Sequence, residues 1–116
     1  MDIRERVVAG ISILDVSGRI VLGEGDVAIK ERVRDLLADG QRRIVINLEG
    51  VSYIDNSGLG ALISSYTTTK RDGGGLKLMH VTKRINDLLA ITKLVTVFDC
   101  FDNQTDAINS FNPVAA

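Results

Sequence analysis

Cysteine and histidine each occur only once in this 116-residue chain. The single cysteine, Cys100, excludes a disulfide within the chain, which is typical of a protein that stays in a reducing compartment such as the cytoplasm. One cysteine and one histidine, His80, without ligand spacing around them predict no metal site, because such sites gather several ligands. The fragments "GEG" and "GLG" complete neither G-x-G-x-x-G nor G-K-[ST], so we expect no cofactor.

An excess of charge of either sign is also missing. The 14 basic and 15 acidic residues leave a net charge of −1 at pH 7, so no broad positive field would attract nucleic acid or an anionic membrane. No apolar run approaches the roughly 20 residues that a membrane-spanning helix needs. The first residues, MDIRERVV, lack the basic-then-apolar order of a secretion signal. We therefore expect a cytoplasmic protein that has neither nucleic acid nor a membrane as its partner.

A catalytic set is absent as well. A nucleophile such as Ser57 or Cys100 needs a base beside it that a third group orients. The only histidine, His80, falls at the end of a predicted strand, where it is more simply read as a partly exposed side chain. The G-x-S-x-G pattern is not met, because Asp55 stands two residues before Ser57. The sequence therefore predicts a binding module and not an enzyme.

The pattern of apolar residues predicts strands that alternate with helices. Residues 3–8 and 11–16 form a predicted hairpin at the sheet edge, which Ser17 and Gly18 end. Apolar residues at helical spacing from Asp26 predict an amphipathic helix that Gly40 caps. The other predicted elements are a central strand at 43–48, a helix that ends near 71–75, a strand at 76–80, a helix capped by Thr82, a strand at 96–101 and a helix at 102–111.

This order predicts the α/β fold class. Strands connected through helices pair in parallel with right-handed crossovers, and the hairpin makes the sheet mixed. We expect one domain over residues 1–112, with a mixed, mostly parallel sheet, an N-terminal β-hairpin and about four packed helices. Residues 113–116, which begin with Pro113, are the predicted tail. Exposed sheet edges are compatible with a monomer or a weak homodimer.

The stretch "YIDNSGLGALI", residues 53–63, joins the central strand to the next helix. Residues 55–57 can all cap a helix, whereas Gly58 and Gly60 each cost helix stability of about 1 kcal/mol relative to alanine. Bare backbone at a helix start suits close approach by another molecule, and the helix dipole there favours negative charge. A phosphate on Ser57 would thus change what docks at this surface without unfolding the domain.

These residues also carry a resemblance. "VSYIDNSGLGALI", between "RRIVINLEG" and "GGGLKLMHVTKRINDLLAITKL", resembles the STAS domain of anti-sigma factor antagonists. The resemblance implies that the unmodified protein binds an anti-sigma factor, a serine protein kinase with a histidine-kinase-like ATPase fold, and so frees the sigma factor. The kinase then phosphorylates the serine before the first glycine, here Ser57, and the complex dissociates. A PP2C-type phosphatase restores the binding form.

Two positions depart from the family pattern, and one of them is Asn56, which stands where serine is common. Many members have G-E-L-D after the second strand, and its acid lies near the phosphorylated serine; residues 18–21 match it here, with Val21 at the acidic position. Glu24 or Asp26 could reach the same area if "GEGD" loops back. Leu59, between the two glycines, either reaches a partner or belongs to the core stripe of the helix. The predicted partner-binding residues are Asp55, Asn56, Ser57, Gly58, Leu59, Gly60, Glu24 and Asp26.

Two alternatives remain open from the sequence. The first keeps the fold without the switch, as a constitutive scaffold in a signalling complex, with Ser57 only capping a helix; Val21 favours this alternative. The second is a small domain that binds an anionic ligand at the same helix start. An enzyme that uses this helix start as an anion site is the weakest of the alternatives, because the sequence offers neither a catalytic base nor a set of metal ligands.

Overall fold

The computed structural model describes residues 1–111, apart from the side chain of Val95. The predicted tail at 113–116, with Pro113, lies outside the described residues. The elements follow one another as β1 (Asp2–Val8), β2 (Ile11–Ile20), α1 (Gly25–Ala38), β3 (Arg43–Ile54), α2 (Asn56–Arg71), β4 (Gly75–Met79), α3 (Lys83–Ile91), a 3₁₀ turn (Leu94–Thr96), β5 (Cys100–Phe101) and α4 (Gln104–Asn109).

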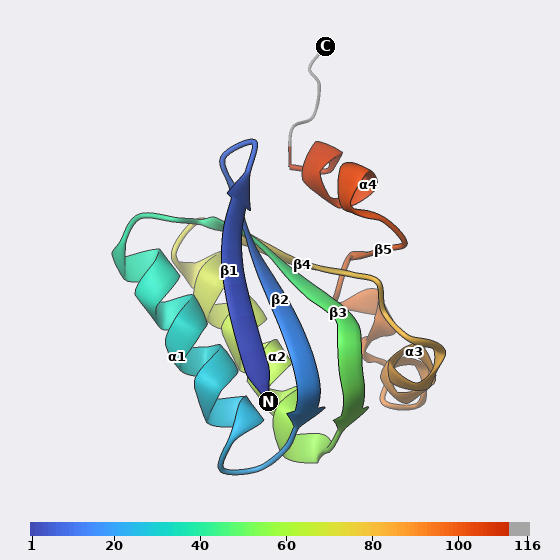
Figure 1. Ribbon diagram of the computed structural model, residues 1–116. Coiled ribbons are helices and arrows are strands. Elements are labelled where there is room, and N and C mark those ends of the chain that lie inside the picture. The colour runs from blue at the N-terminus through green and yellow to red at the C-terminus, as the bar shows by residue number, and fades with distance from the viewer. Residues whose placement is uncertain (112–116) are drawn as a thin grey trace.

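The five strands form one sheet in sequence order, β1-β2-β3-β4-β5. β1 and β2 pair antiparallel, and all other neighbours pair in parallel. The hairpin turn consists of Ala9 and Gly10, both with positive φ (54° and 79°), which matches the right-handed twist of the two strands. The predicted mixed sheet, its hairpin and its four α-helices are therefore confirmed. Figure 1 shows α1 and α2 side by side on one face of the sheet.

The prediction that Ser17 and Gly18 end the second strand is wrong. β2 continues to Ile20, with register shifts against β3 on either side of this pair. Gly18 has φ of +92°, a conformation that glycine adopts without strain, so the chain bends here without leaving the sheet. As a result, Ile20 lies opposite Ile54 at the end of β3, directly before α2.

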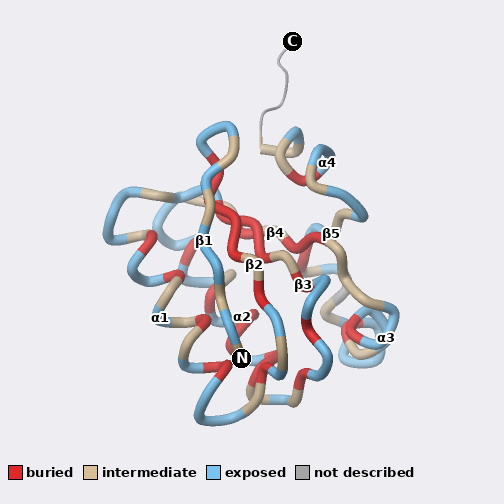
Figure 2. The backbone as a smooth tube through the Cα atoms, in the orientation of Figure 1, coloured by how far each residue is buried: buried red, intermediate tan, exposed pale blue. Residues whose placement is uncertain are grey.

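The core lies on both faces of the sheet. Ile44, Val45 and Ile46 at the centre of β3 are fully buried, which confirms that this strand is covered on each side. Ile44 and Ile46 pack in the larger cluster with α1, α2 and α3. Val45 belongs to a smaller cluster that also contains Ala107 of α4. Figure 2 shows this buried centre and the exposed outer surfaces of α1 and α4.

The structure confirms the helix caps that the sequence predicts at Gly40 and Thr82. Gly40 has φ of +83° and donates its N–H to Leu37 O at the end of α1, and the Thr82 hydroxyl caps α3 by accepting from Ile85 N. The strand predicted at 96–101 is reduced to Cys100–Phe101, because a 3₁₀ turn at residues 94–96 and a turn and bend at 97–98 precede it. No helix within residues 1–111 is both long and apolar enough to cross a lipid bilayer.

Candidate functional site

Asp55 fixes the start of α2. Its backbone is extended (φ −101°, ψ −176°), and its Oδ1 accepts a hydrogen bond from Gly58 N at 2.8 Å. The Asp55 carbonyl oxygen accepts from Leu59 N at 2.9 Å. Among the three candidate capping residues, the structure therefore assigns the cap to Asp55, and Asn56 and Ser57 become the first two residues of the helix.

The same carboxylate connects this helix start to the loop between β2 and α1. Asp55 Oδ2 accepts from Leu22 N at 3.1 Å, and Asp55 N donates to Ile20 O at 3.2 Å. The N–H donors of Gly58 and Leu22 lower the pKa of the Asp55 carboxyl group, with Gly58 as the larger cause, because they stabilise its charged form. The β2–α1 loop and the first turn of α2 thus form one connected surface.

Replacing Asp55 with asparagine will lower the melting temperature at pH 7, and replacing it with alanine will lower it further. Asparagine can still cap the helix through its one oxygen, but its amide nitrogen cannot accept from Leu22 N. Because folding lowers the pKa of Asp55, its stabilisation is complete above the unfolded value of about 3.9 and disappears as the pH falls through the folded value. Melting curves from pH 7 to pH 2.5 should show the wild-type advantage shrinking below about pH 4. A constant advantage would contradict this assignment.

Three of the predicted site residues are accessible to solvent at the start of α2. Asn56 and Gly60 are exposed, and Ser57 is half-buried. A Cβ built on Gly60 meets nothing within 4 Å, so the surface beside Ser57 is open. Within residues 1–111, no hydrogen bond holds the Ser57 hydroxyl group. Ser57 can therefore carry an added group that projects from the first turn of α2.

Gly58 and Leu59 are buried, which corrects their prediction as partner contacts. A Cβ on Gly58 would collide with the carbonyl oxygen of Ile20 and lie 2.8 Å from Ile54 Cγ1. Gly58 thus allows α2 to approach the ends of β2 and β3, and its missing side chain serves the core. Leu59 is 4% exposed and packs in the larger core cluster, as a leucine on the inner stripe of α2 should.

Neither Glu24 in the β2–α1 loop nor Asp26 at the start of α1 replaces the acid missing at Val21. Glu24 is exposed and its Oε1 pairs with the amino group of Met1 at 3.2 Å. Asp26 is 7% exposed, and its Oδ1 accepts from Val27 N at 2.8 Å within the first turn of α1. Burial therefore corrects the prediction of Asp26 as a partner contact, and Glu24 remains available only through its exposed end.

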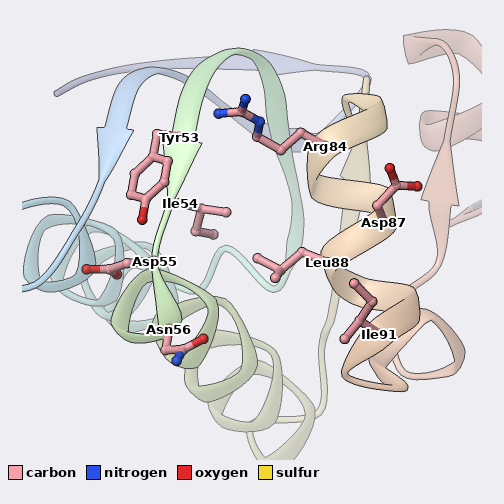
Figure 3. A pocket seen from close by; sticks show the side chains of 8 residues that line it. All are labelled: Tyr53, Ile54, Asp55, Asn56, Arg84, Asp87, Leu88 and Ile91. Atoms are coloured by element: carbon pink, nitrogen blue, oxygen red, sulfur yellow. The ribbon is translucent and has the colours of Figure 1, made fainter.

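A groove beside the helix start was not anticipated. It has a volume of about 430 Å³ and lies between the β3–α2 junction and α3. Figure 3 shows Leu88 of α3 pointing toward Ile54 across it. The residues that line it are Tyr53, Ile54, Asp55, Asn56, Arg84, Asp87, Leu88 and Ile91.

Two side chains that line this groove, and an apolar one near it, are open to solvent. Ile91 is 78% exposed and Tyr53 is 39% exposed, and Leu22, which binds Asp55, is 73% exposed. Ile91 lies off the buried stripe of α3 that contains Ile85 and Leu89, and this was the one signal in the sequence that could have identified it. Exposed apolar residues that gather beside polar ones are typical of a protein interface.

The site offers binding groups but no metal cluster. Within residues 1–111, no three histidine, cysteine, aspartate or glutamate side chains are placed to hold a metal ion. The arrangement consists of a hydroxyl group on an open helix turn, a groove beside it and a carboxylate that caps the helix and binds the β2–α1 loop.

The sequence matches a family model described as the STAS domain over residues 2–107. The chain belongs to the STAS domain family. The anti-sigma-B factor antagonist of Bacillus subtilis is 35% identical over 86 residues, which cover 74% of this chain and 72% of that protein. The recognised motif and the family it indicated are thereby confirmed.

Solved structures share the STAS fold. An anti-sigma factor antagonist from Mycobacterium paratuberculosis superposes with a TM-score of 0.79 at 22% identity, covering 94% of this chain and 92% of that one. The Bacillus cell fate determinant SpoIIAA in its phosphorylated form gives a TM-score of 0.74 at 15% identity, covering 96% of this chain and all of that one. At these identities the likeness concerns the fold alone.

Proposed function

We propose that this STAS protein is an anti-sigma factor antagonist that works by binding and not by catalysis. In its unmodified form it binds an anti-sigma factor serine kinase in the cytoplasm, and the sigma factor is released. The observation that carries the proposal is Ser57, whose hydroxyl group is free of hydrogen bonds to residues 1–111 and lies on the first turn of α2 beside the exposed groove. The Bacillus subtilis relative, named an anti-sigma-B factor antagonist, supports this function.

The docking surface combines polar and apolar contacts. Asn56, Ser57 and Gly60 give the kinase access to the helix backbone, and the groove that Tyr53 and Ile91 border takes an apolar side chain of the partner. Interfaces of this kind depend on a few buried apolar anchors surrounded by polar contacts. The exposed Leu22 extends the surface across the β2–α1 loop.

Phosphorylation of Ser57 switches this binding off. The phosphate adds about −1.5 to −2 charges at pH 7, next to the carboxylate of Asp55, which already holds Gly58 N. The positive end of the helix dipole tolerates the added charge, so the fold persists. The partner, in contrast, must meet two neighbouring negative groups at the helix start, where only Asp55 was charged before. A PP2C-type phosphatase then restores the binding form.

Incubation with the cognate anti-sigma kinase and ATP is the direct test. We expect intact-mass analysis to show one added phosphoryl group, and peptide mapping to place it on Ser57. The Ser57→Ala variant should remain unmodified, and a PP2C-type phosphatase should return the wild type to its original mass. A phosphoryl group on any other residue, or none at all, would overturn the switch.

A constitutive scaffold is the second candidate, and one observation favours it. Val21 stands at the usual acidic position, while Glu24 pairs with Met1 and Asp26 is buried. If that acid is needed to position the kinase, binding would persist without modification. A binding assay with the partner separates the two candidates. Equal affinity for Ser57→Ala, Ser57→Glu and the wild type would support the scaffold.

A further inference from the structure

We propose that the end of the sheet opposite Ser57 holds a second binding site, for a small molecule that carries two or more phosphate or carboxylate groups. This site, here called the basic hollow, has a volume of about 550 Å³, and its cations are Arg42, Arg43, Lys70 and Lys77. It lies at the amino ends of β3 and β4, near α4 in Figure 1. β3 has 12 residues, so at about 3.3 Å per residue the two sites are roughly 35 Å apart.

The charge of the basic hollow contrasts with that of the whole chain. Four cations and one acidic residue, Asp99, line it, so its lining carries four minus one, or +3, in a protein of net charge −1. Even if Asp72, which pairs with Arg42 nearby, is counted, a surplus of +2 remains. A concave surface of one sign concentrates ligands of the opposite charge.

Two of the four cations are held in place by the fold. Arg42 Nε donates to the carbonyl oxygen of Asp72 at 2.9 Å and lies 3.3 Å from its carboxylate, which orients the guanidinium group through one edge. Lys77 Nζ donates to the carbonyl and hydroxyl oxygens of Ser110 at 3.2 and 2.9 Å, and lies 4.5 Å from the centre of the Phe111 ring. Charges positioned in advance lose little entropy when they bind an anion.

The other two cations, Arg43 and Lys70, are exposed and can close on a ligand from two elements, β3 and α2. Arginine pairs with phosphate or carboxylate through two parallel hydrogen bonds, and lysine adds a compact charge. A site with both kinds of side chain binds a ligand with adjacent anionic groups more tightly than a ligand with a single anionic group.

The glycine loop between α2 and β4 forms the floor of the basic hollow. A Cβ on Gly74 would collide with the carbonyl oxygen of Arg42, and one on Gly75 would lie 3.1 Å from the Phe111 ring. Gly73 faces open space with φ of +85°. The N–H groups of all three glycines bind carbonyl oxygens within the protein. Gly74 and Gly75 therefore let the chain approach Arg42 and Phe111 closely. Because the three N–H groups are already bonded, the basic side chains are the groups that bind the anion.

Titration with inorganic pyrophosphate and with citrate, followed by amide NMR, tests the proposal and separates the two sources of anionic groups. At low ionic strength we expect saturable shifts at Gly73, Gly74 and Gly75 with at least one of the two probes, and none at Asn56 or Gly60. The probe that binds more tightly identifies the chemical class. Added salt should weaken binding, because the contacts are ionic.

Matched variants test whether the anionic probe binds in the basic hollow. Arg43→Gln with Lys70→Gln should weaken binding at least tenfold, and the exposed positions of both residues should leave the fold intact. Arg34→Gln with Lys83→Gln removes the same charge from exposed positions outside the hollow and should leave the affinity within twofold. Equal losses in both variants, or no saturation with either probe, would overturn the site. None of these outcomes depends on Ser57, so the proposed switch stands or fails separately.

Discussion

Replacing Gly58 with alanine will lower the free energy of unfolding by about 3 kcal/mol, the upper end of the usual cost of overpacking. The new methyl group would collide with the carbonyl oxygen of Ile20 and approach Ile20 Cγ2 and Ile54 Cγ1 to 2.8 Å. Because the carbonyl oxygen of Ile20 belongs to the backbone of β2, it cannot rotate away as a side chain could. The helix α2 would therefore have to move to relieve the collision. Urea denaturation, with the midpoint and slope fitted together, measures the loss.

Gly60→Ala is the matched control, on the same helix two residues later. Nothing lies within 4 Å of its added Cβ, and alanine favours a helix over glycine by about 1 kcal/mol. This variant should therefore gain about 0.5–1 kcal/mol. Similar effects of the two substitutions, in either direction, would contradict the different environments that the structure gives these glycines.

The different environments of these glycines show what a single sequence can predict. The strand-to-helix junction, the caps at Gly40 and Thr82, and the Ala9–Gly10 hairpin depend on neighbouring residues, and local patterns predicted them. Which glycine of α2 lies against a strand depends on the approach of β2. The bulge at Gly18 determines that approach, because it carries β2 on to Ile20, whereas the sequence predicts a strand end there. The functions of Gly58 and Gly60 could therefore not be separated in advance.

The groove was missed for a related reason. Its two walls, around Tyr53 and Ile91, are distant in the sequence, and they meet only because β4 brings α3 back beside the end of β3. The residues around Ser57 were predictable because a short motif contains the cap, the hydroxyl group and the open glycine together. A site made of one segment can be read from its pattern, whereas a site made of several requires the topology.

Ser57→Glu will weaken binding to the anti-sigma kinase by at least about 100-fold, and Ser57→Ala will bind within a few-fold of the wild type. Like charges brought together in an interface cost several kcal/mol, and 100-fold corresponds to about 2.7 kcal/mol. The new carboxylate would lie beside Asp55 and the groove, where the partner must exclude water. Calorimetry with the purified kinase at physiological salt measures both affinities, and equal affinities would show that charge is not the gate.

Stability measurements show whether Ser57→Glu weakens binding through its charge or by destabilising the fold. Residue 57 is in the first turn of α2, where a negative side chain interacts favourably with the helix dipole by about 0.3–1 kcal/mol. Ser57→Glu should therefore melt at or slightly above the temperature of Ser57→Ala. Weak binding together with an undiminished melting temperature would assign the loss to the docking surface. If Ser57→Glu instead melts well below Ser57→Ala, the added charge disturbs the helix start, and a phosphate there would act by loosening the structure that Asp55 holds.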